Sequence, residues 1–275
     1  MTGDGGEAPI GVFDSGLGGL SVWREICAQL PDESTLYLAD QAHVPYGPRP
    51  PAEIARFSHR IAQYLVRHGA KVIVVACNTA SGAALYSLRE AFPETPFIGM
   101  EPAIKPAAER TRSGRVGVIA TPTTFQGQLY RRLAHRFGRQ VTIYTQVCPG
   151  LVEAIEGGRV DHPQTIDLIR RCLAPLLEKG VDQLVLGCTH YPFVRGSIER
   201  IAGAAVEVID PAPAVARQVG RVLARHDLLA VAASKAAHRF CTTGDRRRMS
   251  RQAALLLGQP MSVASCVWHD GHLTG

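Results

Sequence analysis

The sequence predicts an α/β fold with two similar lobes, each built on a doubly wound parallel sheet. Apolar segments suited to buried strands alternate with helical segments along most of the chain. The pattern that begins near Asp14 restarts near Ala120. Cys77 lies 63 residues after Asp14, and a second cysteine follows Ala120 at a similar interval of 68 residues. We therefore expect two copies of one unit, related by pseudo-two-fold symmetry, with both cysteines facing a shared cleft that holds the active site.

The first copy opens with a short strand, Pro9 to Asp14, which leads into a glycine loop and a helix from Leu20 to Leu30. The loop, Ser15 to Gly19, does not match the GxGxxG pattern of dinucleotide sites. Its glycines let backbone N–H groups approach an anion at the helix start. Asp14 is poorly suited to cradle a phosphate but can orient a group or accept a proton, and helix capping is its structural alternative.

The next predicted strand, Thr35 to Asp40, is followed by a proline-rich loop in which Tyr46 and Gly47 can close over a pocket. Packing of the loop is the alternative role of Tyr46. A helix from Ala52 to His68 carries apolar residues at helical spacing and precedes the third strand.

The third strand of the first copy ends at a cysteine. Val72 to Val75 is β-branched and free of charge, as expected for a strand buried on both faces of a parallel sheet. Ligands bind at the carboxyl ends of such strands, so Cys77 lies where chemistry is expected. Asn78 and Thr79 follow it with hydrogen-bonding side chains. Inert packing is the alternative role of a single buried cysteine.

The second copy repeats these features. A strand from Arg115 ends in hydroxyl-bearing residues, among them Thr121 and Thr124. A strand from Val141 to Cys148 leads to a short helix, Leu151 to Glu156, in which either Glu156 or Glu153 could face the cleft. A helix from Gln164 to Lys179 precedes the last strand of the copy, which ends at Cys188 and is followed by Thr189 and His190.

The segment after the second copy contains a strand near residues 206–212, a helix from Ala214 to Arg225, a strand near 239–245 and a helix from Arg246 to Leu257. We expect this tail to pack back on the first lobe. The first domain would then comprise residues 1–100 and 210–275, and the second would comprise residues 101–209.

Composition favours a globular protein in a reducing compartment. The chain has 275 residues, of which 46% are hydrophobic and 20% charged, and no apolar run approaches the length of a membrane span. The N-terminus lacks the basic region and apolar core of a secretory signal and is expected to be a short mobile tail. Seven scattered cysteines with no CxxC pair suggest reduced thiols rather than a zinc ribbon. The net charge of +6 comes without a nucleic-acid motif, so nucleic acid is not an expected partner.

Six motifs together carry a family resemblance. They are GVFDSGLGGLSV, PYG, ACNTASG, EPAIKPA, GCTHYPF and TTGD. With them the chain resembles the cofactor-independent aspartate/glutamate racemase family, and among its members the glutamate racemases, from about Ile10 to Gly258. Pro122-Thr123 and Pro211 depart from the usual pattern, which affects substrate positioning more than the chemistry.

The resemblance implies interconversion of L-glutamate and D-glutamate without pyridoxal phosphate, metal or other cofactor. It implies that Cys77 and Cys188 are the catalytic acid/bases, supported by Asp14, Glu156 and His190. The substrate-binding positions it implies are Asp14, Ser15, Tyr46, Gly47, Asn78, Thr79 and Thr189. The hydroxyl groups of Thr121 and Thr124 are further candidates for binding the substrate carboxylates. It further implies a bacterial cytoplasmic enzyme, without membrane association, whose D-glutamate feeds peptidoglycan synthesis. A homodimer and, by family analogy, an interaction with DNA gyrase are further partners to test.

Inverting an α-carbon requires removal of a proton on one face and its return on the other, so one acid/base group is needed on each face. A thiolate and a thiol satisfy this requirement if they are desolvated and held close to the carbon. A neighbouring carboxylate such as Asp14 would raise the pKa of a thiol, so helix N-termini, backbone N–H groups and the substrate ammonium must lower it.

Three other readings of the two cysteines remain open. An aspartate racemase or a decarboxylase of the same family would share the motifs. A cysteine hydrolase would use Cys188 as nucleophile and His190 as base, although residues two apart seldom reach that geometry and Cys77 would be superfluous. A thiol metal site would combine Cys77, Cys188 and His190.

Overall fold

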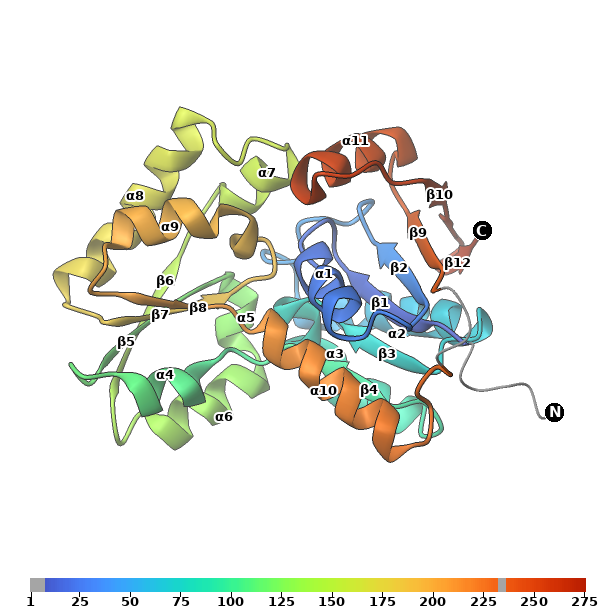
Figure 1. The fold of residues 1–275 in the computed structure, drawn as a ribbon, viewed down its shortest axis with the longest axis horizontal. Coiled ribbons are helices and arrows are strands. Elements are labelled where there is room, and N and C mark those ends of the chain that lie inside the picture. Colours follow the sequence, from blue (N-terminus) through green and yellow to red (C-terminus); the bar gives the residue numbers. More distant parts are fainter. Residues whose placement is uncertain (1–7, 232–235) are drawn as a thin grey trace.

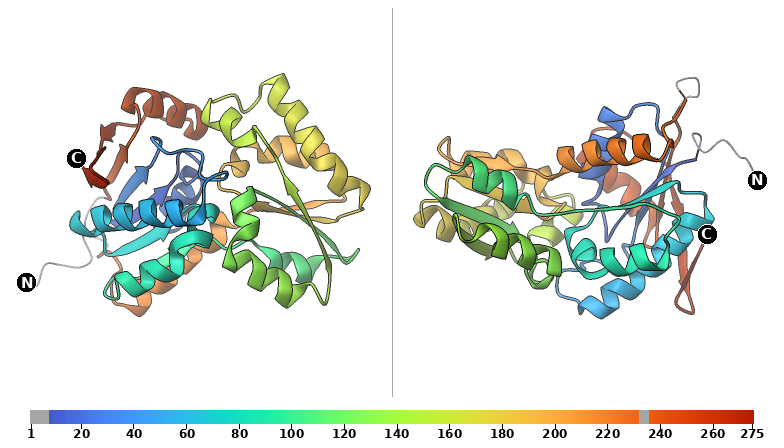
Figure 2. Two further views of the ribbon diagram at one scale, coloured as in Figure 1. Left: turned by 180° about the vertical axis from the view of Figure 1, so that it is seen from behind. Right: turned by 90° about the horizontal axis from the view of Figure 1, so that it is seen from below.

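A computed structural model describes residues 8–231 and 236–275, which form two α/β lobes lying side by side (Figures 1 and 2). The N-terminal tail predicted for the first residues of the chain falls mostly on residues 1–7, which lie outside the described part. In the described ranges no helix is long and apolar enough to cross a membrane.

The first lobe is organised around a parallel sheet with strand order β10-β9-β2-β1-β3-β4. Its strands are β1 (Ile10–Asp14), β2 (Thr35–Ala39), β3 (Val72–Val75), β4 (Phe97–Gly99), β9 (His238–Thr242) and β10 (Val263–Ser265). The central strands β1, β2 and β3 are buried along their whole length, as the uncharged β-branched sequence of β3 predicts. Strand β9 pairs with β2, so the chain returns to the first sheet after the second lobe.

Helices cover both faces of this sheet. They are α1 (Leu20–Gln29), α2 (Pro51–Arg67), α3 (Asn78–Ala91), α10 (Ala212–Arg225) and α11 (Arg246–Leu257). Apolar residues of α1, α10 and α11 pack on one face, and those of α2 and α3 pack on the other. In α2, the apolar residues Ile54, Phe57, Ile61 and Leu65 recur at helical spacing and are all buried against the sheet.

The second lobe contains a smaller parallel sheet with strand order β6-β5-β7-β8. Its strands are β5 (Arg115–Ala120), β6 (Thr142–Val147), β7 (Gln183–Gly187) and β8 (Glu207–Ile209). One face is covered by α7 (Leu151–Glu156), α8 (Pro163–Glu178) and α9 (Arg195–Ala202), and the other by α4 (Ile104–Arg110) and α6 (Gln128–Phe137).

The two sheets repeat the same strand order. In each, the first strand of the unit lies between the second and the third, as β1 lies between β2 and β3, and β5 between β6 and β7. The connection that follows the first strand of each unit and the connection that follows the third strand therefore run to opposite sides of the sheet. Such a switch in direction opens a crevice at the carboxyl ends of these two strands. This repeat supports the domain boundaries at 100/101 and 209/210, which stay a prediction.

Several elements were not predicted from the sequence. These are α4, α6, α9, a short helix α5 (Pro122–Gln126), the 3₁₀ turn η1 (Tyr191–Val194), strand β10 and an antiparallel hairpin formed by β11 (Val267–His269) and β12 (His272–Thr274). The hairpin packs against α2, with Leu273 buried in the core of the first lobe.

The expectation of reduced thiols is wrong for one pair. Cys148 and Cys172 form a disulfide, because the loop before α7 and the middle of α8 bring their Cα atoms to 5.4 Å although they are 24 residues apart in sequence. The free cysteines of the described residues are Cys27, Cys77, Cys188, Cys241 and Cys266.

Candidate functional site

The two cysteines singled out in the sequence lie at the carboxyl ends of equivalent strands, one in each lobe. Cys77 follows β3 and caps the N-terminus of α3, where its Sγ accepts a 3.5 Å hydrogen bond from the N–H of Ala80. Cys188 follows β7. The cysteines are only 5% and 7% exposed.

Three influences raise the pKa of the Cys77 thiol. Burial contributes most, the charge of Asp14 comes next, and Cys188 adds a further increase. The strand ends that carry the two cysteines meet at the border of the lobes, because Thr189, directly after Cys188, donates a hydrogen bond to Asp14 at the end of β1, the strand next to β3.

Asp14 ends β1 and is completely buried. Its Oδ1 accepts hydrogen bonds from Gly16 N at 2.7 Å and from Ser15 Oγ at 3.1 Å, and its Oδ2 accepts one from Thr189 Oγ1 at 2.8 Å. Burial raises the pKa of Asp14, although His190 and these donors act in the opposite direction. Thr189 belongs to the second lobe, so this hydrogen bond joins the lobes beside Cys77.

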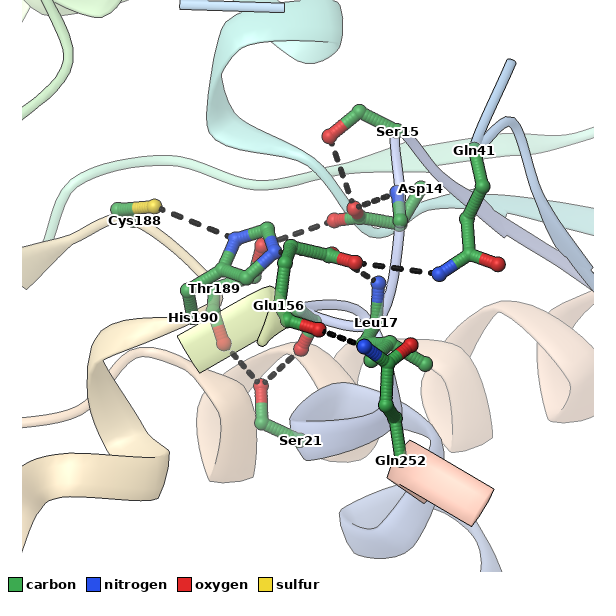
Figure 3. Close-up of polar contacts among 12 residues, drawn as sticks. Asp14, Ser15, Leu17, Ser21, Gln41, Glu156, Cys188, Thr189, His190 and Gln252 are labelled. Carbon is green, nitrogen blue, oxygen red and sulfur yellow. Dashed lines mark hydrogen bonds and ion pairs between the residues drawn. The ribbon is translucent and has the colours of Figure 1, made fainter. Parts of the chain in front are cut away.

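Glu156, His190 and Cys188 form a continuous polar chain (Figure 3). His190 Nδ1 lies 3.7 Å from Cys188 Sγ, and its Nε2 lies 2.7 Å from Glu156 Oε1. Burial alone would lower the pKa of His190, but the contacts with Cys188 and Glu156 raise it well above its ordinary value. Burial would raise the pKa of Glu156, but His190, Leu17 and Gln41 hold it below its ordinary value. The pair is therefore a buried imidazolium and carboxylate.

The two glutamates of α7 lie on different sides of the helix. Glu156 is buried and contacts His190, whereas Glu153 is exposed. The glycine loop has a related role, since Leu17 N donates a 2.6 Å hydrogen bond to Glu156 Oε1. A Cβ atom at Gly16 would collide with the Glu156 carboxylate, and one at Gly18 would lie 2.5 Å from His190 Nδ1. The sequence predicted that these glycines would let an anion approach the start of α1. In the structure that anion is the carboxylate of Glu156.

Threonine hydroxyls from both lobes meet next to the cysteines. Thr79 Oγ1 lies 2.9 Å from Thr121 Oγ1 and 3.2 Å from Thr124 Oγ1. Asn78 is buried nearby in the first turn of α3, and neither polar atom of its side chain has a hydrogen-bond partner among the described residues. Because an unsatisfied buried amide costs free energy, Asn78 is a strong candidate for binding a ligand.

The predicted Tyr46-Gly47 loop bridges the lobes. The carbonyl of Gly47 accepts a 2.6 Å hydrogen bond from Thr123 Oγ1, and a Cβ at position 47 would lie 2.9 Å from Thr121 Cβ. The hydroxyl of Tyr46 donates a 2.6 Å hydrogen bond to Asp40, so the ring is fixed within the core of the first lobe. Packing is therefore part of the role of Tyr46.

Sequence and structure comparisons agree with this geometry. The profile of Asp/Glu/Hydantoin racemases matches residues 10–219. The chain belongs to the Asp/Glu/Hydantoin racemase family. As a member, it is an enzyme of the isomerase class, an amino-acid racemase. The glutamate racemase of Pseudomonas aeruginosa PAO1 is 51% identical over 261 residues, which cover 95% of this chain and 98% of that relative.

Solved structures of glutamate racemases share the fold of this racemase. A Bacillus anthracis isoform is 34% identical with a TM-score of 0.86, and the match covers 97% of this chain and 99% of that one. The Escherichia coli enzyme, solved with L-glutamate and the activator UDP-MurNAc-Ala, is 31% identical with a TM-score of 0.83, covering 98% and 100%. The Francisella tularensis enzyme, solved with D-glutamate, is 30% identical with a TM-score of 0.83, covering 96% and 98%.

Three residues of the racemase site were not predicted from the sequence. Asp40 is buried at the end of β2 and accepts hydrogen bonds from Tyr46, Thr243 and Trp268. Gln41 follows it, and Gln252 lies on α11. The position of Asp40 and Gln41 at a strand end could have revealed them. Nothing in the sequence near Gln252 distinguishes it from other residues of an amphipathic helix.

The polar chain in this racemase also bears on the alternative readings. His190 does reach Cys188, so the expectation that residues two apart would miss this contact is wrong, because the turn after β7 folds the imidazole back toward the sulfur. The described residues contain no group of three or more His, Cys, Asp or Glu side chains placed to hold a metal ion.

Proposed function

We propose that this chain is a glutamate racemase that interconverts L-glutamate and D-glutamate by a cofactor-independent, two-base transfer of the Cα proton. The observation that carries the proposal is the placement of two buried thiols just after equivalent strands of two lobes, whose ends are joined by the hydrogen bond from Thr189 to Asp14. The relatives that match nearly the full chain are named glutamate racemases, which favours glutamate over aspartate.

In the proposed reaction, the Cys188 thiolate removes the proton from Cα of L-glutamate. The Cys77 thiol then donates its proton to the opposite face and gives D-glutamate. The reverse direction begins with the Cys77 thiolate. In the first half the Cα–H bond breaks and an S–H bond forms on Cys188; in the second half the S–H bond of Cys77 breaks and a new Cα–H bond forms. Conversion of L-glutamate therefore leaves Cys77 as the thiolate, and a turnover in the reverse direction restores the starting state.

The residues around each sulfur have matching roles. His190, held in place by Glu156, lies with its Nδ1 3.7 Å from the Cys188 sulfur, within reach of a hydrogen bond to it. Cys77 lies at the N-terminus of α3, where the helix dipole and the N–H of Ala80 favour a thiolate. Asp14 opposes that effect and is suited to bind the substrate ammonium, whose positive charge would acidify Cα and assist the thiolate.

The two carboxylates of glutamate require donors that are fixed before the reaction begins. Groups suited to this lie on both lobes, at Asn78, Thr79, Thr121 and Thr124 and in the Tyr46-Gly47 loop. The hydroxyls of Ser15 and Thr189 donate to Asp14 and fix that carboxylate beside them. Donors placed in this way stabilise the charge that develops on the α-carboxylate as the proton leaves.

A cysteine hydrolase remains less well supported, although Cys188, His190 and Glu156 resemble a nucleophile, base and orienting acid. That reaction has no use for the second buried thiol at Cys77. As a racemase, the protein would supply D-glutamate for peptidoglycan in a bacterial cytoplasm, and a homodimer remains to be tested.

The decisive experiment follows deuterium uptake at Cα of L-glutamate and of D-glutamate in D2O, with purified protein and no added cofactor. We expect both enantiomers to exchange and racemise, and L-aspartate to react far more slowly. A protein that releases ammonia or forms an acyl-enzyme without exchange at Cα would overturn the proposal.

A further inference from the structure

Glu156 belongs to the second lobe, but most of its hydrogen-bond donors belong to the first. Its carboxylate accepts hydrogen bonds from Leu17 N at 2.6 Å and from Gln41 Nε2 at 3.1 Å, and its backbone carbonyl accepts one from Gln252 Nε2 (Figure 3). Among the described residues of the second lobe, His190 is the one whose side chain forms a hydrogen bond with Glu156. The end of α7 is thus held by three separate elements of the opposite lobe.

The two glutamine amides are themselves held in place. Gln41 Oε1 accepts a 3.1 Å hydrogen bond from Thr242 Oγ1 at the end of β9, and this orients the amide so that Nε2 faces Glu156. A Cβ at Gly244 would lie 2.8 Å from the Cβ of Gln41, so a larger residue there would displace it.

Gln252 is costly to bury. Its side chain is 8% exposed, and its Oε1 has no hydrogen-bond partner among the described residues. Its Nε2 donates a hydrogen bond to the carbonyl of Glu156, the one side-chain hydrogen bond of Gln252 within residues 8–231 and 236–275. An apolar side chain would avoid the unsatisfied oxygen, so stability alone does not explain an amide at this position.

Neutral amides suit this role better than cations would. A lysine or arginine beside Glu156 would neutralise the carboxylate and compete with His190 for it. An amide donates a hydrogen bond, fixes the direction of the carboxylate and leaves its charge available to the imidazolium. The arrangement therefore orients Glu156 without weakening its ion pair with His190.

We propose that Gln41 and Gln252 are positioning residues that make the Glu156–His190–Cys188 chain complete only when the two lobes are closed. Separation of the lobes would remove the donors from Leu17, Gln41 and Gln252 together, and Glu156 would lose the contacts that direct it at His190. This inference rests on the proposed function, because Cys188 must act as an acid/base for its positioning to matter.

The test compares Gln41→Met, Gln252→Met and Gln164→Met, in which Gln164 is an exposed control on α8. We expect kcat/KM for glutamate to fall about tenfold in each of the first two variants and to stay unchanged in the control. The thermal midpoint of Gln41→Met should stay near that of the wild type, because Gln41 is only partly buried. Equal kcat/KM in all three variants would overturn the inference.

A double-mutant cycle separates positioning from general packing. In a Glu156→Gln background, Gln41→Met should change kcat/KM by less than about twofold, because the carboxylate that Gln41 orients is already gone. A full tenfold loss in that background would show that Gln41 acts elsewhere.

The pH profile gives an independent readout. Gln41 is one of the donors that lower the pKa of Glu156, so its loss should move the acid limb of kcat/KM to higher pH. The other charged or titratable groups that face Glu156 are Asp14, Tyr37 and His190, which all remain in the variant. An unshifted acid limb would contradict the inference. A wild-type protein that fails to racemise glutamate would instead overturn the proposed function.

Discussion

Thr189 of the second lobe donates a 2.8 Å hydrogen bond to the carboxylate of Asp14 in the first lobe. The two residues occupy strand ends beside Cys188 and Cys77, so one hydrogen bond connects the surroundings of both sulfurs. The same hydrogen bond therefore links the two lobes and fixes the Asp14 carboxylate. The predictions below test the parts of this arrangement separately.

Replacement of Cys77 or Cys188 should abolish racemisation while the fold remains intact. Cys77→Ala and Cys188→Ala each remove one of the two acid/base groups, so kcat should fall by about 10³-fold or more, as followed by the loss of optical rotation of each enantiomer. Cys27→Ala is the control, because Cys27 lies on α1, only partly buried and away from the site. Full activity in either active-site variant would end the two-base account.

Glu156→Gln should lower kcat/KM by about 10- to 100-fold, because it removes the carboxylate that stabilises the imidazolium of His190. The matched control is Glu153→Gln, one helical turn away on the exposed face of α7, which should retain wild-type activity. Steady-state kinetics on both variants would measure the difference. Similar losses of kcat/KM in the two variants would show that activity depends on the integrity of α7 and not on the Glu156–His190 ion pair.

The Glu156–His190 pair should stabilise the fold most between about pH 4.5 and pH 6.5, the ordinary pKa values of the two groups. Folding lowers the pKa of Glu156, so its contribution is complete above 4.5 and is lost as the pH falls through the folded value. Folding raises the pKa of His190, so its contribution is complete below 6.5 and is lost as the pH rises through the folded value.

Urea unfolding of wild type and Glu156→Gln across this pH range would measure that window. The difference between their free energies of unfolding should be largest inside it and decline on both sides. The same difference for Glu153→Gln should be flat, and a flat curve for Glu156→Gln would contradict the assigned ion pair.

Asn78→Leu should raise the stability of the protein and weaken its binding of glutamate. The side chain is 4% exposed and unsatisfied in the described structure, so an apolar residue of similar size should raise the free energy of unfolding by about 1 kcal/mol. The KM for glutamate should rise about tenfold or more, because the substrate loses a preplaced amide. Chemical denaturation and kinetics on the same preparation would test both, and an unchanged KM would remove Asn78 from the binding site.

The disulfide between Cys148 and Cys172 should stabilise the second lobe by about 3 kcal/mol. This is the free energy expected when a crosslink across a loop of this length lowers the entropy of the unfolded chain. Dithiothreitol should therefore lower the urea midpoint of the wild type and have no effect on a Cys148→Ala/Cys172→Ala variant. Cys27→Ala should respond as the wild type does. A wild-type midpoint that ignores the reductant would show that the thiols are not bonded in solution.

Much of the fold and of the site could be predicted from local sequence. Parallel strands that are buried on both faces are nearly pure apolar runs, and the polar residues that end them mark the edge where ligands bind. Asp14, Cys77, Thr121 and Cys188 all lie at such strand ends. Within each lobe, the first and third strands are neighbours in the sheet, so the residues that follow them lie close together. Both lobes share this strand order, as expected for two copies of one unit.

The rest depends on contacts between distant segments. Gln252 acts at Glu156 only because α11 packs at the border of the two lobes, and Cys148 meets Cys172 only because α8 lies against the loop before α7. The amphipathic helix α6 has no strong capping residue at its start, so its boundaries carry little signal in the sequence. The choice between Glu153 and Glu156 required the orientation of α7 itself.

Strand β9 is inserted next to β2, although the whole second lobe separates the two in the chain. During synthesis, the ribosome must therefore produce all of β5 to β8 before the first sheet can be finished. Until then, the nascent first lobe carries an open β2 edge, a template for pairing with other chains. The second lobe can mature early, whereas the first depends on the last quarter of translation and on protection of that edge.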